Sequence, residues 1–485
     1  MLINASQFLN APGPVPLLAR IPFHHLTPLD AYHAILRDQP SFLLESGAPA
    51  GRGAQARYSF IGGSPYQILE ARNRLLRQWT PHDQWQSWTP TADPLRDAFA
   101  LMDGSGVSMP PGAPPFVGGV VGCLGYGLSR RHLRPGHPAR AALFPDLYWL
   151  FVDLVGAFDL AERTLTASFC PAPERFAGES RAGLLKEGRE RLEAFLATVT
   201  HPVASPSNLR ETRPIVATGM SREDYCAMVE RAKAYIAAGD IFQANLAQRF
   251  TAPYAGRDGL DVYRRLHTIN PSPFAAFLDL GDTHVICSSP ERLVRRAGRE
   301  VETRPIAGTR PRGANSADDA RLTTDLLLNA KERAEHLMLV DLERNDLGRV
   351  CAYGSVKVDE LMVTEHYSHV IHIVSNIRGT LRNNATNFDV LDAMFPGGTI
   401  TGVPKIRCME IIEELEPVSR GLYTGSIGYV SWSGHMDWNI VIRTLTLSRG
   451  ELAFYAGAGI VADSDPEKEH AETLYKAQAL IDAVR

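Results

Sequence analysis

The stretch Phe395-Pro-Gly-Gly-Thr-Ile-Thr-Gly-Val-Pro-Lys405 marks the passage from a glycine-rich turn to a helix-forming run, Lys405 to Leu415. Its backbone N–H groups and the N-terminus of the following helix could receive a carboxylate or a phosphate. It is not a Walker A loop, because neither serine nor threonine follows Lys405. The segment is equally consistent with an ordinary strand-to-helix turn, so it indicates no nucleotide-binding P-loop fold.

Strand-like and helix-forming runs mix on both sides of this stretch. Helix-forming composition covers residues 182–195 and 325–342, and Ser221 with Asp224 resembles a capping box at the start of another helix. The last helix begins near Ser464-Asp-Pro-Glu467, where proline occupies the first turn. Short apolar runs bounded by glycine, proline or aspartate predict strands at residues 41–45, 116–122, 147–153, 244–250, 274–278 and 284–287. Such mixing is typical of an α+β fold.

A polar, proline-containing segment, His201-Pro-Val-Ala-Ser-Pro-Ser-Asn208, has the composition of a connection. We place a boundary there, between an N-terminal region, residues 1–200, and a second region, residues 215–485.

Composition excludes several classes of protein. The 485 residues include 50 Lys and Arg against 54 Asp and Glu, and the basic residues are scattered, so we expect no nucleic-acid partner. Six cysteines without paired spacing suit reduced thiols in a cytosolic protein. No run of 18 uncharged apolar residues and no signal-peptide pattern occurs, so we expect a cytoplasmic protein with no membrane partner.

A few charged residues attract interest on their own. Arg443 lies in an apolar run that predicts a strand, and its guanidinium needs either a substrate carboxylate or a structural salt bridge. Glu335 and Glu472 lie beside apolar residues on predicted helices, although most acidic residues on helices are simply solvated. Magnesium commonly takes one or two protein carboxylates, and two helices could supply them.

One apparent motif lacks the residues that its chemistry would need. Gly122-Cys-Leu-Gly125 faintly resembles the nucleophile turn of a glutaminase, but we find no base histidine and orienting acid to accompany it. A buried glycine-rich strand is the better interpretation.

Four segments in the same order resemble the chorismate-utilising enzymes, specifically anthranilate synthase component I and aminodeoxychorismate synthase component I. They are Arg304-Pro-Ile-Ala-Gly-Thr-Arg-Pro-Arg312, Ala334-Glu-His-Leu-Met-Leu-Val-Asp-Leu-Glu-Arg-Asn-Asp346, the stretch from Phe395 to Lys405, and Gly457-Ala-Gly-Ile-Val-Ala-Asp463. The resemblance implies an α+β sandwich of two large antiparallel-rich sheets with helices outside.

The resemblance also implies a metal and an acid. Glu335 and Glu472 match the ligands of a magnesium ion, Mg2+, that holds the ring carboxylate of chorismate. Lys476 matches a lysine beside the second of these glutamates. Glu291 matches the general acid that protonates the departing 4-hydroxyl, which leaves far more readily as water than as hydroxide.

Further positions match groups around the substrate. Arg443, Tyr429 and the backbone of Gly457 and Gly459 match the site of the enolpyruvyl carboxylate, and His372 and Thr399 match groups near the ring. The remaining positions that the resemblance places at the substrate are Gln243, Ala307, Gly308 and Thr309.

Gln243 separates two branches of the family. Relatives that add water to chorismate carry a lysine at this position, which activates the water. Glutamine cannot act as that base, whereas ammonia is already a nucleophile, so the resemblance favours amination. Since the chain shows no convincing glutaminase, we expect a separate glutamine amidotransferase subunit as the partner that supplies ammonia.

The product is harder to assign. Typical aminodeoxychorismate synthases carry a lysine where this chain has Ala307, and this residue alone favours anthranilate synthase component I. The flanking segments Gln243-Ala-Asn-Leu-Ala-Gln-Arg-Phe250, Pro273-Phe-Ala-Ala-Phe277 and Pro396-Gly-Gly-Thr-Ile-Thr-Gly402 favour aminodeoxychorismate synthase component I, which we take as the leading prediction.

Leu44, Glu45 and Ser46 match part of an effector pocket in these enzymes. Phe274 and Ala275 depart from the Tyr-Met of the tryptophan-sensitive anthranilate synthases, which argues against feedback inhibition by tryptophan.

Overall fold

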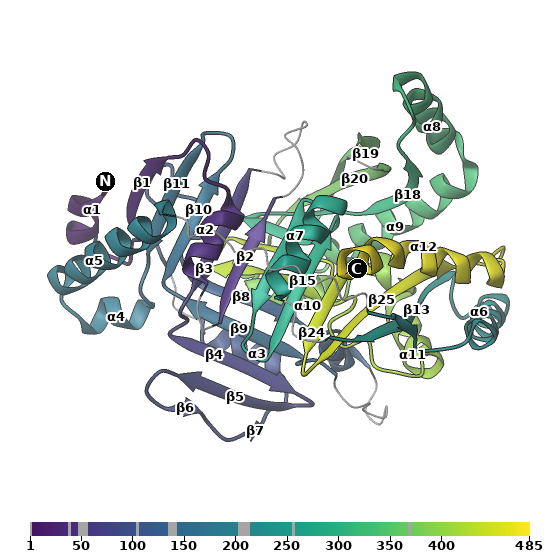
Figure 1. The fold of residues 1–485 in the computed structure, drawn as a ribbon, viewed down its shortest axis with the longest axis horizontal. Coiled ribbons are helices and arrows are strands. Elements are labelled where there is room, and N and C mark those ends of the chain that lie inside the picture. The colour runs from purple at the N-terminus through teal and green to yellow at the C-terminus, as the bar shows by residue number, and fades with distance from the viewer. Residues whose placement is uncertain are drawn as a thin grey trace.

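The computed structural model describes residues 2–36, 40–46, 57–102, 106–133, 143–201, 214–254, 258–366 and 370–485. Within these ranges two large antiparallel sheets pack face to face, and helices cover their outer faces (Figure 1). The predicted sandwich is therefore confirmed.

The first sheet contains twelve strands among the described residues. In spatial order they are β1 (Leu17–Pro22), β11 (Thr164–Phe169), β10 (Leu154–Asp159), β3 (Tyr58–Gly63), β2 (Ser41–Glu45), β14 (Phe274–Asp279), β15 (Thr283–Ser289), β24 (Thr444–Ser448), β25 (Glu451–Ile460), β13 (Gln243–Pro253) and β12 (Ala217–Thr218), with β21 (Gly402–Val403) paired to β13.

The second sheet contains thirteen strands among the described residues. In spatial order they are β18 (Ile306–Pro311), β20 (Val370–Thr380), β17 (Glu300–Arg304), β16 (Arg292–Ala297), β23 (Met436–Asn439), β22 (Ser426–Ser431), β8 (Gly119–Leu124), β9 (Leu147–Val152), β4 (Gln67–Arg72), β5 (Leu75–Thr80) and β6 (Gln84–Trp85), with β19 (Lys357–His366) paired to β20 and β7 (Thr89–Pro90) paired to β5.

Helices lie on both outer faces and at the end that carries β13. They are α1 (Ala5–Asn10), α2 (Pro28–Ile35), α3 (Pro94–Ala100), α4 (Pro173–Gly178), α5 (Arg181–Thr200), α6 (Arg222–Ala237), α7 (Gly259–Ile269), α8 (Ser316–Leu328), α9 (Ala330–Gly348), α10 (Asn387–Met394), α11 (Lys405–Leu415) and α12 (Pro466–Val484), with short 3-10 turns at Tyr126–His132 and Gly398–Ile400. Among these described helices, none combines the length and the apolar character that crossing a bilayer requires.

The alternation of side chains along each strand builds three apolar layers. Phe42 in β2 packs between the sheets with Val121 of β8, whereas its neighbour Leu43 packs outward with Leu192 of α5. On the far side, Trp149 of β9 packs in the layer that contains helices α3, α9 and α10. The central strands, such as β8 and β9, are therefore buried on both faces.

Local signals located several of the helix ends. The side chain of Ser221 accepts a hydrogen bond from the N–H of Asp224, as its capping pattern predicts. The helix predicted at residues 325–342 is divided, because Asn329 ends α8 and its side chain caps α9 by accepting from the N–H groups of Lys331 and Glu332. Gly122 lies in the fully buried strand β8, as expected for an ordinary strand.

The N-terminal and C-terminal regions share both sheets. Strand β2 pairs with β14 in the first sheet, and β8 pairs with β22 in the second. Of the proposed connection, His201 to Asn208, all but His201 lies outside the described residues. The boundary in the sequence is therefore not a boundary in space.

Candidate active site

A cavity of about 620 Å³ is lined by residues of β13, β18, β20, β25, α9 and α12. It brings together twelve of the residues that the sequence singled out, from elements far apart in the chain. They are Gln243, Glu291, Ala307, Gly308, Glu335, His372, Thr399, Arg443, Gly457, Gly459, Glu472 and Lys476. Thr309 lies beside this set, since it pairs with His372 across β18 and β20.

Acidic side chains gather where α9 and α12 border the cavity. Glu335 and Glu472 are joined there by Glu332 and Glu469. Burial raises the pKa of Glu335, and the charge of Glu332 raises it further, while a hydrogen bond from Gln243 Nε2 at 2.9 Å lowers it. Carboxylate oxygens are the ligands that magnesium prefers, and the ion commonly needs only one or two of them from the protein, so Glu335 and Glu472 could contribute to such a site.

Lys476 holds the α12 side of the cavity in place. Its ammonium lies 2.7 Å from Glu472 Oε1, one turn earlier on the helix, and donates to the carbonyl oxygen of Gly457 at 3.0 Å. The side chains of Glu472 and Lys476 are nearly half exposed, so this ion pair is screened by water and contributes little to stability. The ion pair instead holds the Lys476 ammonium in place, and the hydrogen bond from that ammonium to Gly457 O connects α12 with the glycine-rich strand β25.

Glu291 is the carboxyl group best placed to give up a proton. It is 4% exposed, and burial raises its pKa from 4.5 to about 7, although the Thr399 hydroxyl, the N–H of Ile306 and the charge of Arg443 each lower it. Its backbone is fixed, since Ile440 N–H donates to its carbonyl oxygen at 3.0 Å. The side chain can therefore hold a proton close to neutral pH and release it to a leaving group in the cavity.

Arg443 enters the cavity from an irregular segment, which corrects the strand that its apolar neighbours suggested. Strand β23 ends at Asn439 and β24 begins at Thr444, and Arg443 has a positive φ of 50°. A non-glycine residue in this conformation is strained and is often found at functional sites. The turn directs a guanidinium, the natural partner of a carboxylate, into the cavity.

His372 on β20 remains neutral in this environment. It is 2% exposed, and burial together with the charge of Arg443 lowers its pKa to about 3. A neutral imidazole can donate from one nitrogen and accept at the other, so His372 can orient a substrate group without adding charge.

The wall formed by β25 requires glycine at two positions. A Cβ atom at Gly457 would lie 2.7 Å from Asn245 Oδ1, and one at Gly459 would lie 2.5 Å from Gln243 Nε2. At Gly457 the Cβ atom would also lie 2.8 Å from the backbone oxygen of Leu246, so alanine there would press on β13 itself. At Gly459 the close atom belongs to the side chain of Gln243, so alanine there would push that amide aside.

Tyr429, for which a contact with substrate was predicted, does not line this cavity. It lies in β22 and stacks on Phe116 with ring centroids 4.6 Å apart, in the layer between the sheets. It lines a second cavity of about 340 Å³ together with Leu44, Glu45 and Ser46. Phe274 also lines that second cavity, so the predicted effector residues do lie together.

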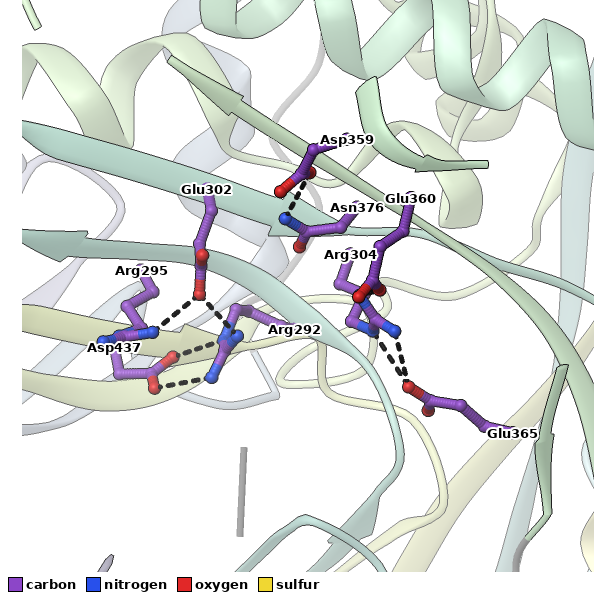
Figure 2. Close-up of polar contacts among 9 residues, drawn as sticks. All are labelled: Arg292, Arg295, Glu302, Arg304, Asp359, Glu360, Glu365, Asn376 and Asp437. Atoms are coloured by element: carbon purple, nitrogen blue, oxygen red, sulfur yellow. Dashed lines mark hydrogen bonds and ion pairs between the residues drawn. The ribbon is translucent and has the colours of Figure 1, made fainter. Parts of the chain in front are cut away.

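One strand separates the two cavities. Glu291 lines the first and the next residue, Arg292, lines the second. Arg292 donates to both carboxylate oxygens of Asp437 at 3.0 and 3.1 Å and to Glu302 at 3.0 Å, and Arg295 also donates to Glu302 (Figure 2). Figure 2 shows these side chains meeting across β16, β17 and β23. The contacts hold β16, the strand that begins directly after Glu291.

A second set of ion pairs holds the neighbouring strand β17. Arg304 is 2.5 Å from Glu360 and 2.7 Å from Glu365, both on β19 (Figure 2). Because Arg304 ends β17 two residues before Ile306, these contacts position the start of β18, where Ala307 and Gly308 face the substrate cavity.

Several lining residues escaped the sequence analysis. Asn245 lies two positions after Gln243 on β13, so strand alternation alone would have placed both on one face. Glu332 and Glu469 precede the predicted metal ligands by three residues, a spacing that places both members of each pair on the same face of a helix. Tyr423 and Tyr455 have no comparable local signal, because only the tertiary fold stacks their rings, with centroids 5.4 Å apart.

Comparison with known proteins agrees with this geometry. The family model described as "chorismate binding enzyme" matches residues 39–482. The chain is 42% identical over 460 residues to anthranilate synthase component 1 of Thermus thermophilus, covering 94% of this chain and 95% of that protein. It is 38% identical over 467 residues to aminodeoxychorismate synthase component 1 of Bacillus subtilis, covering 96% of each.

A solved structure supports the same assignment. The crystal structure of anthranilate synthase component I from Streptococcus pneumoniae superposes with a TM-score of 0.77 at 33% sequence identity, covering 89% of this chain and 94% of that one. With a family match over most of its length and relatives of this identity, the chain belongs to the chorismate binding enzymes.

Proposed function

We propose that this chain is component I of an aminodeoxychorismate synthase, which converts chorismate and ammonia to 4-amino-4-deoxychorismate. The observation that supports amination is that one cavity contains both Glu291 and Gln243. Glu291 is an acid that holds its proton near neutral pH, and Gln243 is a neutral amide. An amide cannot deprotonate water, whereas ammonia needs no such activation.

In the net reaction a C–N bond forms on the ring and the C4–O bond breaks. Glu291 supplies the proton with which the hydroxyl leaves as water, and the new amine loses one proton in return. Arg443 pairs with a substrate carboxylate, and neutral His372 orients the ring from the β20 side.

Magnesium is part of the proposal. Glu335 and Glu472 would hold it, since both are carboxylates that line the same cavity and burial already raises the pKa of Glu335. The ion would supply positive charge for the ring carboxylate of chorismate, which the neighbouring glutamates would otherwise repel.

Amination at C4 is supported by three segments that resemble the aminodeoxychorismate enzymes and by the relative of that name in Bacillus subtilis. A second candidate, anthranilate synthase component I, is favoured by Ala307, whose methyl group cannot form a covalent adduct with the ring, and by the names of other relatives. If the first proposal holds, C4 amination proceeds without a lysine at position 307.

Product analysis decides between the two. The purified chain is incubated with chorismate, magnesium chloride and ammonium chloride, with and without added aminodeoxychorismate lyase. We expect 4-aminobenzoate only when the lyase is present. Anthranilate and pyruvate formed without the lyase would establish the second candidate, and isochorismate formed without ammonium would refute amination.

We also propose a separate glutamine amidotransferase subunit as the source of ammonia. The isolated chain should therefore turn over with ammonium chloride and be inert with glutamine. Turnover of glutamine by the purified chain alone would contradict a separate glutaminase.

A further inference from the structure

A buried carboxyl group lies just behind the wall of the substrate cavity. Glu343 follows Leu339, which lines the cavity, by four residues on α9, so the two side chains lie on one face of the helix. The Glu343 side chain is 2% exposed. Burying a carboxyl group costs free energy that its contacts must offset, so these contacts indicate what the residue does.

Three elements meet at this carboxyl group. Its Oε1 accepts a hydrogen bond from the N–H of Gly398 at 3.3 Å, and its Oε2 accepts one from the hydroxyl of Thr303 on β17, also at 3.3 Å. Glu343 therefore connects α9 with the 3-10 turn Gly398–Ile400 and with β17.

The turn that Glu343 holds carries a residue of the candidate active site. Thr399 directly follows Gly398 and lines the cavity. Its hydroxyl lies close enough to Glu291 to lower the pKa of that acid. The contact between Glu343 and Gly398 thus fixes the backbone one residue before the hydroxyl that meets the acid.

The same turn is confined on two sides. A Cβ atom on Gly398 would overlap the side chain of Leu342 on α9, and one on Gly397 would lie 2.8 Å from Ile440 Cδ1. Ile440 is also the residue whose N–H donates to the carbonyl oxygen of Glu291. A shift of the turn relative to α9 would therefore be transmitted to the acid.

The surroundings of Glu343 favour its uncharged form. Among the described residues, both of its hydrogen bonds come from neutral groups. Lys405 of α11 pairs with Asp346, 2.5 Å away on α9, so its charge is shared. Burial, together with the charges of Asp346 and Glu291, raises the pKa of Glu343 from 4.5 to about 8, although Lys405 lowers it. Glu343 should therefore keep its proton at neutral pH.

We propose that Glu343 is a positioning residue of the reaction, an uncharged carboxyl group that holds the turn Gly398–Ile400 so that the Thr399 hydroxyl meets Glu291. The inference rests on the proposed function, in which Glu291 protonates the departing hydroxyl, and names a residue that acts on this acid from outside the cavity. Because Glu343 does not line the cavity, its loss should change kcat rather than the KM for chorismate.

The first test replaces Glu343 with leucine, which has a similar size and no acceptor. Chorismate consumption with magnesium and ammonium chloride is the readout, so the result does not depend on which product forms. We expect kcat to fall by about ten- to a hundredfold, since a slightly misplaced catalytic group loses this much, and the KM for chorismate to stay within about twofold. Glu70→Leu, equally buried on β4 outside the cavity, is the matched control and should leave kcat unchanged.

Glu343→Gln examines the uncharged form. Glutamine can accept from the N–H of Gly398 and donate to Thr303, so its kcat should lie within about threefold of the wild-type value. With free ammonia kept saturating, the alkaline midpoint of kcat/KM for chorismate reports the ionisation of Glu291. This midpoint should agree between the glutamine variant and the wild-type protein, because neither carries a charge at position 343 when Glu291 ionises.

A double-mutant cycle tests whether Glu343 acts through Thr399. Thr399→Val removes the hydroxyl and keeps the shape of the side chain. Combining it with Glu343→Leu should lower kcat by no more than about twofold beyond the less active single variant, since groups that act as a unit are not additive. If the leucine variant does not fold, as judged by its melting curve, Glu343→Met takes its place, because methionine adapts to the same space.

The outcomes separate this inference from the proposed function. An unchanged kcat in Glu343→Leu, or losses that multiply in the double variant, would overturn the positioning role while the wild-type protein still consumes chorismate. An alkaline midpoint about one pH unit lower in Glu343→Gln would overturn the uncharged form, because an ionised Glu343 would then be raising the pKa of Glu291. Failure of the wild-type protein to consume chorismate at any ammonium concentration would overturn both proposals.

Discussion

Replacing Glu291 with glutamine is expected to abolish most activity and yet to stabilise the folded protein at neutral pH and above. The side chain is 4% exposed, and burial raises its pKa from 4.5 to about 7. Because one pKa unit corresponds to about 1.4 kcal/mol, the ionised carboxylate is disfavoured in the folded protein by about 3 kcal/mol. Glutamine has nearly the same shape and carries no charge, so it avoids this penalty.

The direction in which pH changes the free energy of unfolding follows from which state of the protein keeps the proton of Glu291. Between pH 4.5 and about 7 the folded protein keeps the proton of Glu291, whereas the unfolded chain has released it. This contribution to the free energy of unfolding is therefore greatest in acid, falls as the pH rises through that interval and levels off above it. Relative to the wild-type protein, the glutamine variant should gain about 3 kcal/mol between about pH 4.5 and pH 8.

Urea unfolding of both proteins across this pH interval, without chorismate, measures the difference. Turnover of the same preparations should fall by about 10²- to 10⁴-fold in the variant, the usual contribution of a general acid. Glu193→Gln, on the exposed face of α5, controls for the loss of a carboxylate at the surface. A stability difference that does not change with pH would refute the reasoning, because Glu291 would then ionise normally and hold no proton for the leaving group.

Three further perturbations follow from the same structure. Chelation with EDTA should remove activity and magnesium should restore it, with Glu335→Gln raising the half-maximal magnesium concentration on the order of tenfold; activity that survives exhaustive chelation would exclude the metal. Arg443→Lys should raise the KM for chorismate by about ten- to a hundredfold in steady-state assays, since lysine cannot form a forked pair with a carboxylate, and an unchanged KM would remove Arg443 from the substrate. Arg420→Met should destabilise the protein by about 3–5 kcal/mol in urea, because Glu416, 3% exposed and 2.6 Å from the lost guanidinium, stays buried without that cation; a loss below about 1 kcal/mol would contradict this.

Local chemistry in the sequence was sufficient for many elements of the fold. The cap at Ser221 and the proline at position 466 lie where the sequence placed them, since both act within one turn of helix. At Asn329 the composition alone was misleading. Residues on both sides of it favour a helix, but its side chain caps α9 and so divides the run into two helices.

The candidate site depended on long motifs rather than on single residues. Glu335 and Glu472 reach one cavity from helices more than a hundred residues apart, and nothing local distinguishes them from solvated glutamates. Tyr429 lines the other cavity for a related reason: a motif fixes a residue's position in the chain, but the face of β22 on which its ring lies follows from packing against Phe116.

The sharing of both sheets by the two regions of the chain has a consequence for biosynthesis. Strand β2 cannot complete its pairing until β14, more than two hundred residues later, has been synthesised. An emerging N-terminal region therefore presents open strand edges and half-covered apolar faces, the surfaces on which nascent chains aggregate and to which chaperones bind. Folding of this protein must wait until most of its C-terminal region has left the ribosome.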